Sequence, residues 1–234
     1  MRVALCISGE LRHGFASFPY IYNSFLNRRD DVDVFIHSWE SNNDVFELYS
    51  AKHTILDDCE PTREYLINTL KLNSDVTIDG TSNISNNLLM YFGINKVISL
   101  VDYNYDTYDI LIRIRPDMYL NNKLNLDKII SDIRSDKYDI QIPNSKYNFG
   151  GYNDQIAIGN RQSMKVYGNF INQIEAISNK YKIWHSETLL KYYLDEFNIR
   201  VNQLNYDYRL LRDVTLRLSS TIFEDKSKET KIIY

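Results

Sequence analysis

The middle of the chain reads Tyr108-Asp109-Ile110-Leu111-Ile112-Arg113-Ile114-Arg115-Pro116-Asp117, an apolar run that stops abruptly in charged residues. An almost unbroken series of isoleucine and leucine is typical of a strand that helices cover on both faces of a sheet. Pro116 cannot continue a central strand, so the sheet is predicted to end there. We therefore expect an α/β fold with a mostly parallel central sheet, and a charged cluster at the carboxyl edge, where ligands usually bind.

The charged end of this strand indicates an anion site. Alternation places Arg113 and Arg115 on the same side of the strand, and guanidinium forks suit phosphate oxygens. The carboxylate of Asp117 beside phosphates would suit a hard divalent cation that bridges to them. The combination favours a nucleoside diphosphate with a metal ion. The alternative is a cluster of charges that neutralise one another, but two arginines against one aspartate leave positive charge that needs an anion.

The composition bounds the class of protein. The chain has 234 residues, of which 44% are hydrophobic, enough for one substantial core. A net charge of −4 without a long basic run argues against broad electrostatic binding to nucleic acid. No stretch approaches the roughly 18 apolar residues of a membrane span, and the apolar start is too short for a signal peptide. Cys6, inside an apolar strand pattern, is expected to be a buried free thiol, and the protein to be soluble and cytoplasmic.

The periodicity of apolar residues predicts alternating strands and helices. Strands are expected at 2–8, 32–36, 76–78, 108–115, 138–142, 154–159 and 199–201, and helices at 16–28, 62–71, 83–100, 126–135, 161–178 and 185–197. A polar loop is expected at 144–153, and His13 and His53 are expected in loops. Residues 223–234 are predicted to form a solvated polar tail.

Two loops after predicted strands carry groups suited to a nucleotide. After the first strand, Gly9 lets the backbone approach a ligand, and Arg12 could reach a pyrophosphate; a turn with a surface arginine is the alternative. After the second strand, Trp39 could stack on a base or sugar and His37 could donate to a phosphate. The alternative there is a tryptophan that packs on the surface beside a hydrogen-bonded histidine. Neither loop is a P-loop or a dinucleotide fingerprint.

Two later segments carry candidate acid–base groups. Asp154-Gln155 follows a glycine-containing loop, so Asp154 could act as general base on a hydroxyl; an Asx-type turn that caps the loop is the alternative. In His185-Ser186-Glu187, the structural interpretation makes Ser186 the N-cap of a helix with Glu187 in its first turn. The functional interpretation has His185 or Glu187 facing a sugar or a metal.

The order of these motifs resembles that of a group of nucleotide-sugar glycosyltransferases. The segments that carry the resemblance are Ser8–Arg12, Asp33–Trp39, Tyr108–Asp117 and Asp154–Gly159. The group includes chlorella-virus enzymes that glycosylate the major capsid protein and bacterial polysaccharide-type transferases. Each motif is short, and their order and spacing make the resemblance specific. It extends from residue 2 to about residue 201, nearly the whole chain.

The resemblance implies a GT-A fold, a single Rossmann-like domain over residues 1–222. Its nucleotide-binding half would be about 1–120 and its acceptor half about 121–222. It further implies a UDP-sugar donor, Mn²⁺ or Mg²⁺, a glycan or glycoprotein acceptor, and transfer of a hexose or deoxyhexose. If the protein is viral, it would act in the host cytoplasm.

The resemblance also implies roles for single residues. In such enzymes an Asp-x-Asp motif holds the metal; Arg115-Pro116-Asp117 keeps only its last aspartate, so Asp117 would inherit the metal role. Asp154 would match the catalytic base of inverting members. The nucleotide contacts would fall to Ser8, Gly9, Glu10 and Arg12.

The expected reaction is a direct displacement that Asp154 or Glu187 assists as base, which would invert the sugar. A retaining enzyme would not need Asp154 in that role, so the stereochemistry stays open. The competing class is a non-catalytic nucleotide-sugar or glycan-binding module of a larger glycosylation protein, which the incomplete Asp-x-Asp motif favours. A third interpretation is a nucleotidyltransferase or hydrolase on a similar sheet.

Overall fold

The computed structural model describes residues 1–11, 13–27, 29–79, 83–104, 108–120, 124–144 and 150–211, so the predicted tail lies outside the described residues. A seven-stranded sheet in the order β10-β7-β8-β5-β1-β2-β3 forms its centre. The strands are β1 Val3–Ser8, β2 Val32–Ser38, β3 His53–Leu56, β5 Ile110–Ile114, β7 Ile140–Pro143, β8 Ile156–Asn160 and β10 Val201–Leu204. Only β8 runs antiparallel to its neighbours in this sheet. The predicted α/β class and mostly parallel sheet are confirmed.

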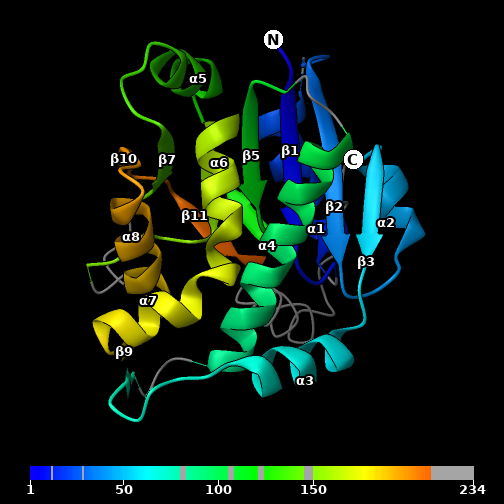
Figure 1. Cartoon of the computed structure of the whole chain (residues 1–234). Helices are drawn as coiled ribbons and strands as arrows, with labels where there is room; N and C mark the ends of the chain where they lie inside the picture. Colours follow the sequence, from blue (N-terminus) through cyan, green and yellow to red (C-terminus); the bar gives the residue numbers. More distant parts are fainter. Residues whose placement is uncertain are drawn as a thin grey trace, which may run out of the picture.

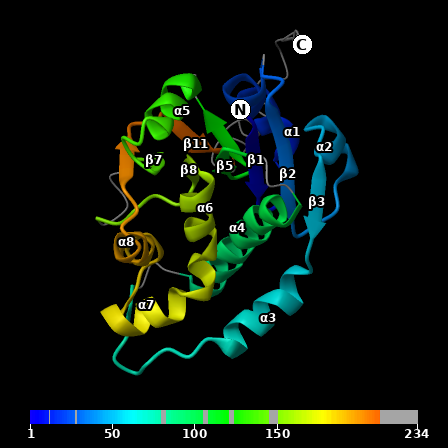
Figure 2. The same cartoon turned by 45° about the horizontal axis from the view of Figure 1, so that its top comes forward.

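Helices cover both faces of the sheet, giving three layers (Figures 1 and 2). One face is covered by α1 Gly14–Ile21, its π-helical continuation η1 Tyr22–Leu26, α2 Asn43–Leu48 and α5 Leu126–Arg134. The other is covered by α4 Ile84–Asn104, α6 Arg161–Gly168, the 3₁₀ turn η2 Asn169–Asn172, α7 Ile174–Tyr181 and α8 Ser186–Glu196. Within the described ranges, no helix is both long and apolar enough to cross a membrane.

The side chains of each strand point alternately into two hydrophobic cores, one on each face of the sheet. In β1, Val3 and Leu5 pack toward α1 and α5, whereas Ala4 and Cys6 pack toward α4 and α6. Both faces are therefore buried, which explains why the strand sequences are almost continuously apolar. Cys6 is fully buried and free, as expected, and this burial raises the pKa of its thiol.

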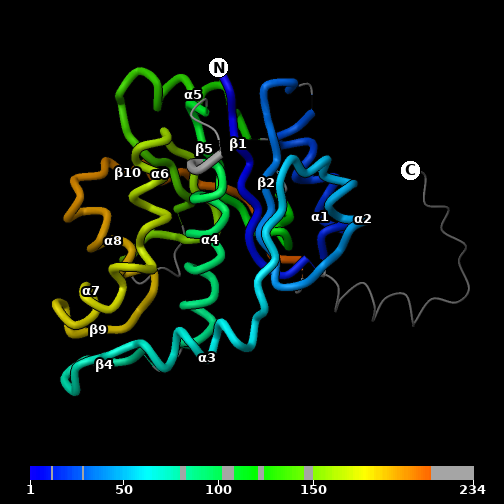
Figure 3. The backbone as a smooth tube through the Cα atoms, turned by 45° about the vertical axis from the view of Figure 1, so that its right-hand side comes forward, coloured from blue at the N-terminus to red at the C-terminus, as the bar shows by residue number. Residues whose placement is uncertain are grey.

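The topology gathers chemically useful groups at one edge of the sheet. The parallel strands β1, β2 and β5 end at the edge that faces α3 Cys59–Thr69, which lies beneath the long α4 (Figures 1 and 3). Because β8 is antiparallel to β5, with Ile114 opposite Ile156, β8 begins where β5 ends. Asp154, two residues before that pair, therefore lies at the same edge as Pro116, two residues after it.

Several predicted elements differ from the structure. The helix expected at 161–178 is divided into α6, η2 and α7, because the Gly168-Asn169 pair is poor in helix propensity. His53 begins the edge strand β3 instead of lying in a loop. The apolar periodicity of the sequence did not indicate α2, β3, or the short strands β6 Met118–Leu120, β9 Ile183–Trp184 and β11 Tyr208–Leu210. The weak strand expected at 76–78 is the two-residue β4 Thr77–Ile78, which pairs with β9.

Candidate active site

A pocket of about 210 Å³ lies at this edge of the sheet. The lining comes from the ends of β1 and β5 with the residues that follow them, from the residue after β2, and from α3 and α4. The lining residues are Ser8, Gly9, Glu10, Trp39, Cys59, Arg63, Asn86, Leu89, Met90, Gly93, Arg113, Arg115, Pro116 and Asp117. The structure thus brings together seven of the candidate site residues predicted from the sequence, which come from three segments far apart in the chain.

Gly9, directly after β1, allows the backbone there to pack closely against Pro116, which follows β5. Its φ of +138° is a conformation that residues with a side chain rarely adopt. A Cβ atom at this position would lie 3.2 Å from Cδ of Pro116. The backbone N–H of Gly9 donates to the carbonyl of His37 at 3.3 Å, which fixes the loop against the end of β2.

Arg113 is a buried cation in the pocket wall. Only 1% of the residue is exposed, and burial lowers the pKa of its guanidinium. Its Nε donates to Oγ of Ser8 at 3.4 Å and its Nη1 donates to the backbone carbonyl of Asp154. Within the described part of the chain, no carboxylate forms an ion pair with Arg113. Because a buried charge without a counterion is costly, this site is suited to receive an anion.

Arg115 and Asp117 form a bidentate pair. Nε and Nη2 of Arg115 donate to the two carboxylate oxygens of Asp117 at 2.8 and 2.9 Å. Burial lowers the pKa of Arg115, but the hydrogen bonds that Arg115 donates to Asp117 outweigh this effect, and the net shift of the pKa is upward. Among the described residues, no group of three or more acidic, histidine or cysteine side chains is placed to hold a metal. The lining carries two carboxylates, Glu10 and Asp117, and Asp117 already accepts at both oxygens from a guanidinium, so this donor set does not fit a resident Mn²⁺ or Mg²⁺ ion.

Asp154 does not line the pocket, but its backbone carbonyl accepts the hydrogen bond from Arg113, which does. Its carboxyl Oδ2 accepts a hydrogen bond from the hydroxyl of Tyr91 at 3.2 Å. The pKa of Asp154 is raised to about 6, mainly by burial and to a smaller extent by the negative charge of Glu187. The Asx turn considered for Asp154 belongs to its neighbour, because Oδ1 of Asn153 accepts from the backbone of Gln155 at 3.0 Å. The Asp154 carboxyl is therefore not needed to cap the loop.

Glu187 is held next to Asp154 by the start of α8. His185, and not Ser186, is the N-cap: its Nδ1 accepts from the backbone N–H of Thr188 at 3.4 Å and lies 2.8 Å from the Thr188 hydroxyl. This geometry assigns the ring proton to Nε2, which lies 3.4 Å from Oε2 of Glu187. Ser186 donates to the same oxygen at 2.9 Å, and Glu187 occupies the first helical turn as expected.

A glycine lets the loop before Asp154 reach α8. A Cβ atom on Gly151 would lie 2.3 Å from the carbonyl carbon of Glu187. The next backbone N–H, of Tyr152, donates to the carbonyl of Glu187 at 2.9 Å. The two candidate carboxylates are therefore brought together by close backbone packing.

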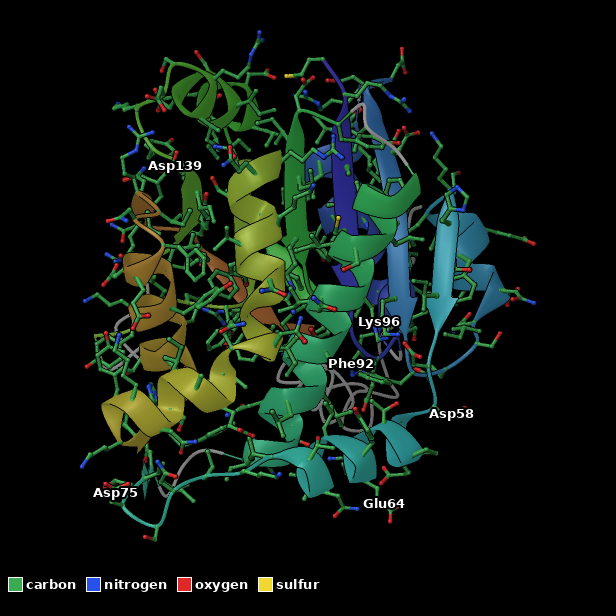
Figure 4. All side chains as sticks on the ribbon, in the orientation of Figure 1. Asp58, Glu64, Asp75, Phe92, Lys96 and Asp139 are labelled. Carbon is green, nitrogen blue, oxygen red and sulfur yellow. The ribbon has the colours of Figure 1, made fainter. Side chains whose placement is uncertain are left out.

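His37 lies behind the pocket instead of in its lining. The residue is fully buried, and burial is the main reason that the pKa of its imidazole is lowered to about 4, although Asp57 at 3.3 Å opposes the shift. Trp39 meets His37 edge to face with 4.7 Å between ring centroids and stacks on Phe92 at 5.8 Å. Phe92 lies on α4, next to Lys96 and above α3 (Figure 4). This placement favours Trp39 over His37 as a group that contacts a ligand.

Arg12 lies outside the described residues. Gln155 is close to Asp154, and its Oε1 is buried without a hydrogen-bond partner among the described residues. Sequence patterns did not point to Cys59, Arg63 or Tyr91, because the sequence of a helix does not show which edge of the sheet the helix will face.

The chain is similar to several solved structures. Mouse xyloside xylosyltransferase 1 superposes with a TM-score of 0.51 at 10% identity, over 87% of this chain and 84% of that one. A putative glucose-1-phosphate thymidylyltransferase from Bacillus anthracis matches with a TM-score of 0.46 at 10% identity, over 98% of each chain. A glycosyltransferase involved in glycosylation of the major capsid of PBCV-1 matches with a TM-score of 0.44 at 8% identity, over 88% and 83%.

The expected GT-A type of fold is therefore confirmed, at the level of architecture, by a glycosyltransferase neighbour. No curated protein matches the chain in sequence. The family model described as "Domain of unknown function (DUF7796)" matches residues 1–220, and the chain belongs to that family.

Proposed function

We propose that this chain is a glycosyltransferase that moves a sugar from a UDP-sugar to a hydroxyl group of a glycan. One observation carries the proposal. Arg113 lines the pocket and at the same time donates to the carbonyl of Asp154, so a cationic pocket and a buried carboxylate of raised pKa are joined through one side chain. Such a pairing suits a reaction that releases an anion on one side and accepts a proton on the other.

The pocket supplies the donor side. Arg63, Arg113 and Arg115 line it, and guanidinium forks match phosphate oxygens. Trp39 offers an aromatic face to a base. Ser8 and Gly9 bring the end of β1 to the same place, where a backbone without a side chain can approach the diphosphate.

Asp154 supplies the acceptor side. With a pKa of about 6 it is mostly ionised at neutral pH and still basic enough to take a proton. In the reaction, the acceptor oxygen forms a bond to the anomeric carbon while its proton passes to Asp154. The bond from that carbon to the diphosphate oxygen breaks, and the electron pair leaves with UDP. One direct displacement of this kind inverts the anomeric centre.

The test is release of UDP from a panel of UDP-sugars with and without glycan acceptors. The wild type is compared with Asp154→Asn and with Asp30→Asn, a control at an exposed turn. We expect acceptor-dependent UDP release that Asp154→Asn abolishes and Asp30→Asn retains. Nucleotide binding without turnover would identify a binding module, and release of pyrophosphate or a monophosphate would identify the third class of protein instead.

A further inference from the structure

The arginines of the pocket are held in place by neighbouring side chains. Nη1 of Arg63 donates to Oγ of Ser85 at 2.9 Å and to Oδ1 of Asn86 at 3.0 Å, both in the first turn of α4. Its Nη2 lies 3.6 Å from Sγ of Cys59, and its Nε lies 3.3 Å from a carboxylate oxygen of Glu60. A guanidinium has five N–H donors, so within the described structure Arg63 retains one Nη2–H for a ligand.

Arg115, which directly follows β5, is held in the same manner. Its two contacts with Asp117 use one edge of the guanidinium. Both carboxylate oxygens of Asp117 accept hydrogen bonds from this arginine, and only 11% of the Asp117 side chain is exposed. A cation that coordinated Asp117 would have to displace Arg115 or sit beside its positive charge, and both are unfavourable.

We infer that the pocket binds the diphosphate of its donor without a divalent cation, with Arg63, Arg113 and Arg115 supplying the positive charge. Asp117 is then a positioning residue that holds Arg115, and not a metal ligand. This inference rests on the proposed function, because it names how the same site holds its leaving group. The charge on the departing diphosphate is met by fixed guanidinium groups, which need no reorganisation as the bond breaks.

Binding of nucleoside diphosphates gives the test, independently of turnover. The affinity for UDP, with GDP and dTDP beside it, is measured by calorimetry in excess EDTA and in excess Mn²⁺. Alkylation of Cys59 by N-ethylmaleimide gives a second measurement, because Cys59 lines the pocket. Cys6, which is the other cysteine of the chain, is fully buried. We expect the same affinity within about twofold in both conditions, and equal protection of Cys59.

Variants identify the role of Asp117. Arg115→Gln and Asp117→Asn are each expected to weaken UDP binding by about 10-fold or more in EDTA and in Mn²⁺ alike, the cost of a charge-assisted hydrogen bond. The double variant should bind no more weakly than Arg115→Gln alone, since the two residues act as one unit. Arg63→Gln tests the other wall, and Arg134→Gln, exposed at the end of α5, is its control.

The outcomes separate this inference from the proposed function. If Mn²⁺ tightens binding to the wild type by tenfold or more, and Asp117→Asn removes that gain, the inference is overturned and the proposed function stands. If no nucleoside diphosphate binds or protects Cys59 in either condition, the proposed function fails and the inference fails with it.

Discussion

Replacing Asp154 by asparagine is expected to stabilise the fold at neutral pH while it removes the proposed base. The side chain is buried beside Glu187, and both effects raise its pKa from 3.8 to about 6. A shift of about two pH units is equivalent to about 3 kcal/mol. The wild type therefore bears this free-energy cost whenever Asp154 is ionised in the folded state, and the Asp154→Asn variant does not.

The sign of the pH dependence follows from proton linkage. Between the two pKa values the folded state retains a proton that the unfolded chain has lost, so stability falls as the pH rises. The cost from Asp154 grows from about 0.5 kcal/mol at pH 4 to about 3 kcal/mol at pH 7 and then stays constant. The advantage of Asp154→Asn should rise over the same window. For a chain of this length, 3 kcal/mol corresponds to roughly 6 to 12 °C in Tm.

The assay is chemical denaturation followed by circular dichroism at intervals between pH 4 and pH 8. The free energy of unfolding of Asp154→Asn minus that of the wild type is plotted against pH, with Asp30→Asn as the exposed control. Any effect of the amide itself is a constant offset, so only the change with pH matters. A difference that is flat across this range would refute the raised pKa.

In parallel, the rate of sugar transfer by Asp154→Asn should fall by roughly 10²–10⁴-fold if Asp154 is the base.

Three further outcomes test other parts of the site. UDP should quench tryptophan fluorescence, and Trp39→Phe should abolish the response, because Trp184, the second of two tryptophans, is fully buried. Glu187→Gln should shift the acid limb of the pH profile of kcat/KM to lower pH, because it removes a charge that raises the pKa of Asp154; an unmoved limb contradicts that coupling. Gly151→Ala should destabilise the fold by about 1–3 kcal/mol in thermal or denaturant unfolding, since its Cβ would meet the backbone of Glu187; a wild-type Tm would show that the loop can shift freely.

The sequence by itself determined the class of fold and one side of the site. The apolar run that ends at Ile114 required a strand buried on both faces, and Pro116 required that strand to stop. Since parallel strands present their carboxyl ends at one edge, Ser8, Trp39 and Arg113 were expected to converge, and all three line the pocket. These are local properties of chemistry and periodicity, which a sequence displays directly.

The tertiary structure alone decided which elements surround that edge. Apolar periodicity does not record strand direction, so the antiparallel pairing of β8, which puts Asp154 at the same edge of the sheet as Pro116, could not be predicted. The same holds for Arg63, whose position depends on α3 crossing beneath α4. The partner of Asp117 was ambiguous for a related reason: a carboxylate two residues from an arginine can bind a metal or the arginine, and only the rotamers distinguish them. The sequence shows the chemistry of each side chain, but packing between segments that are distant along the chain determines which side chains come into contact.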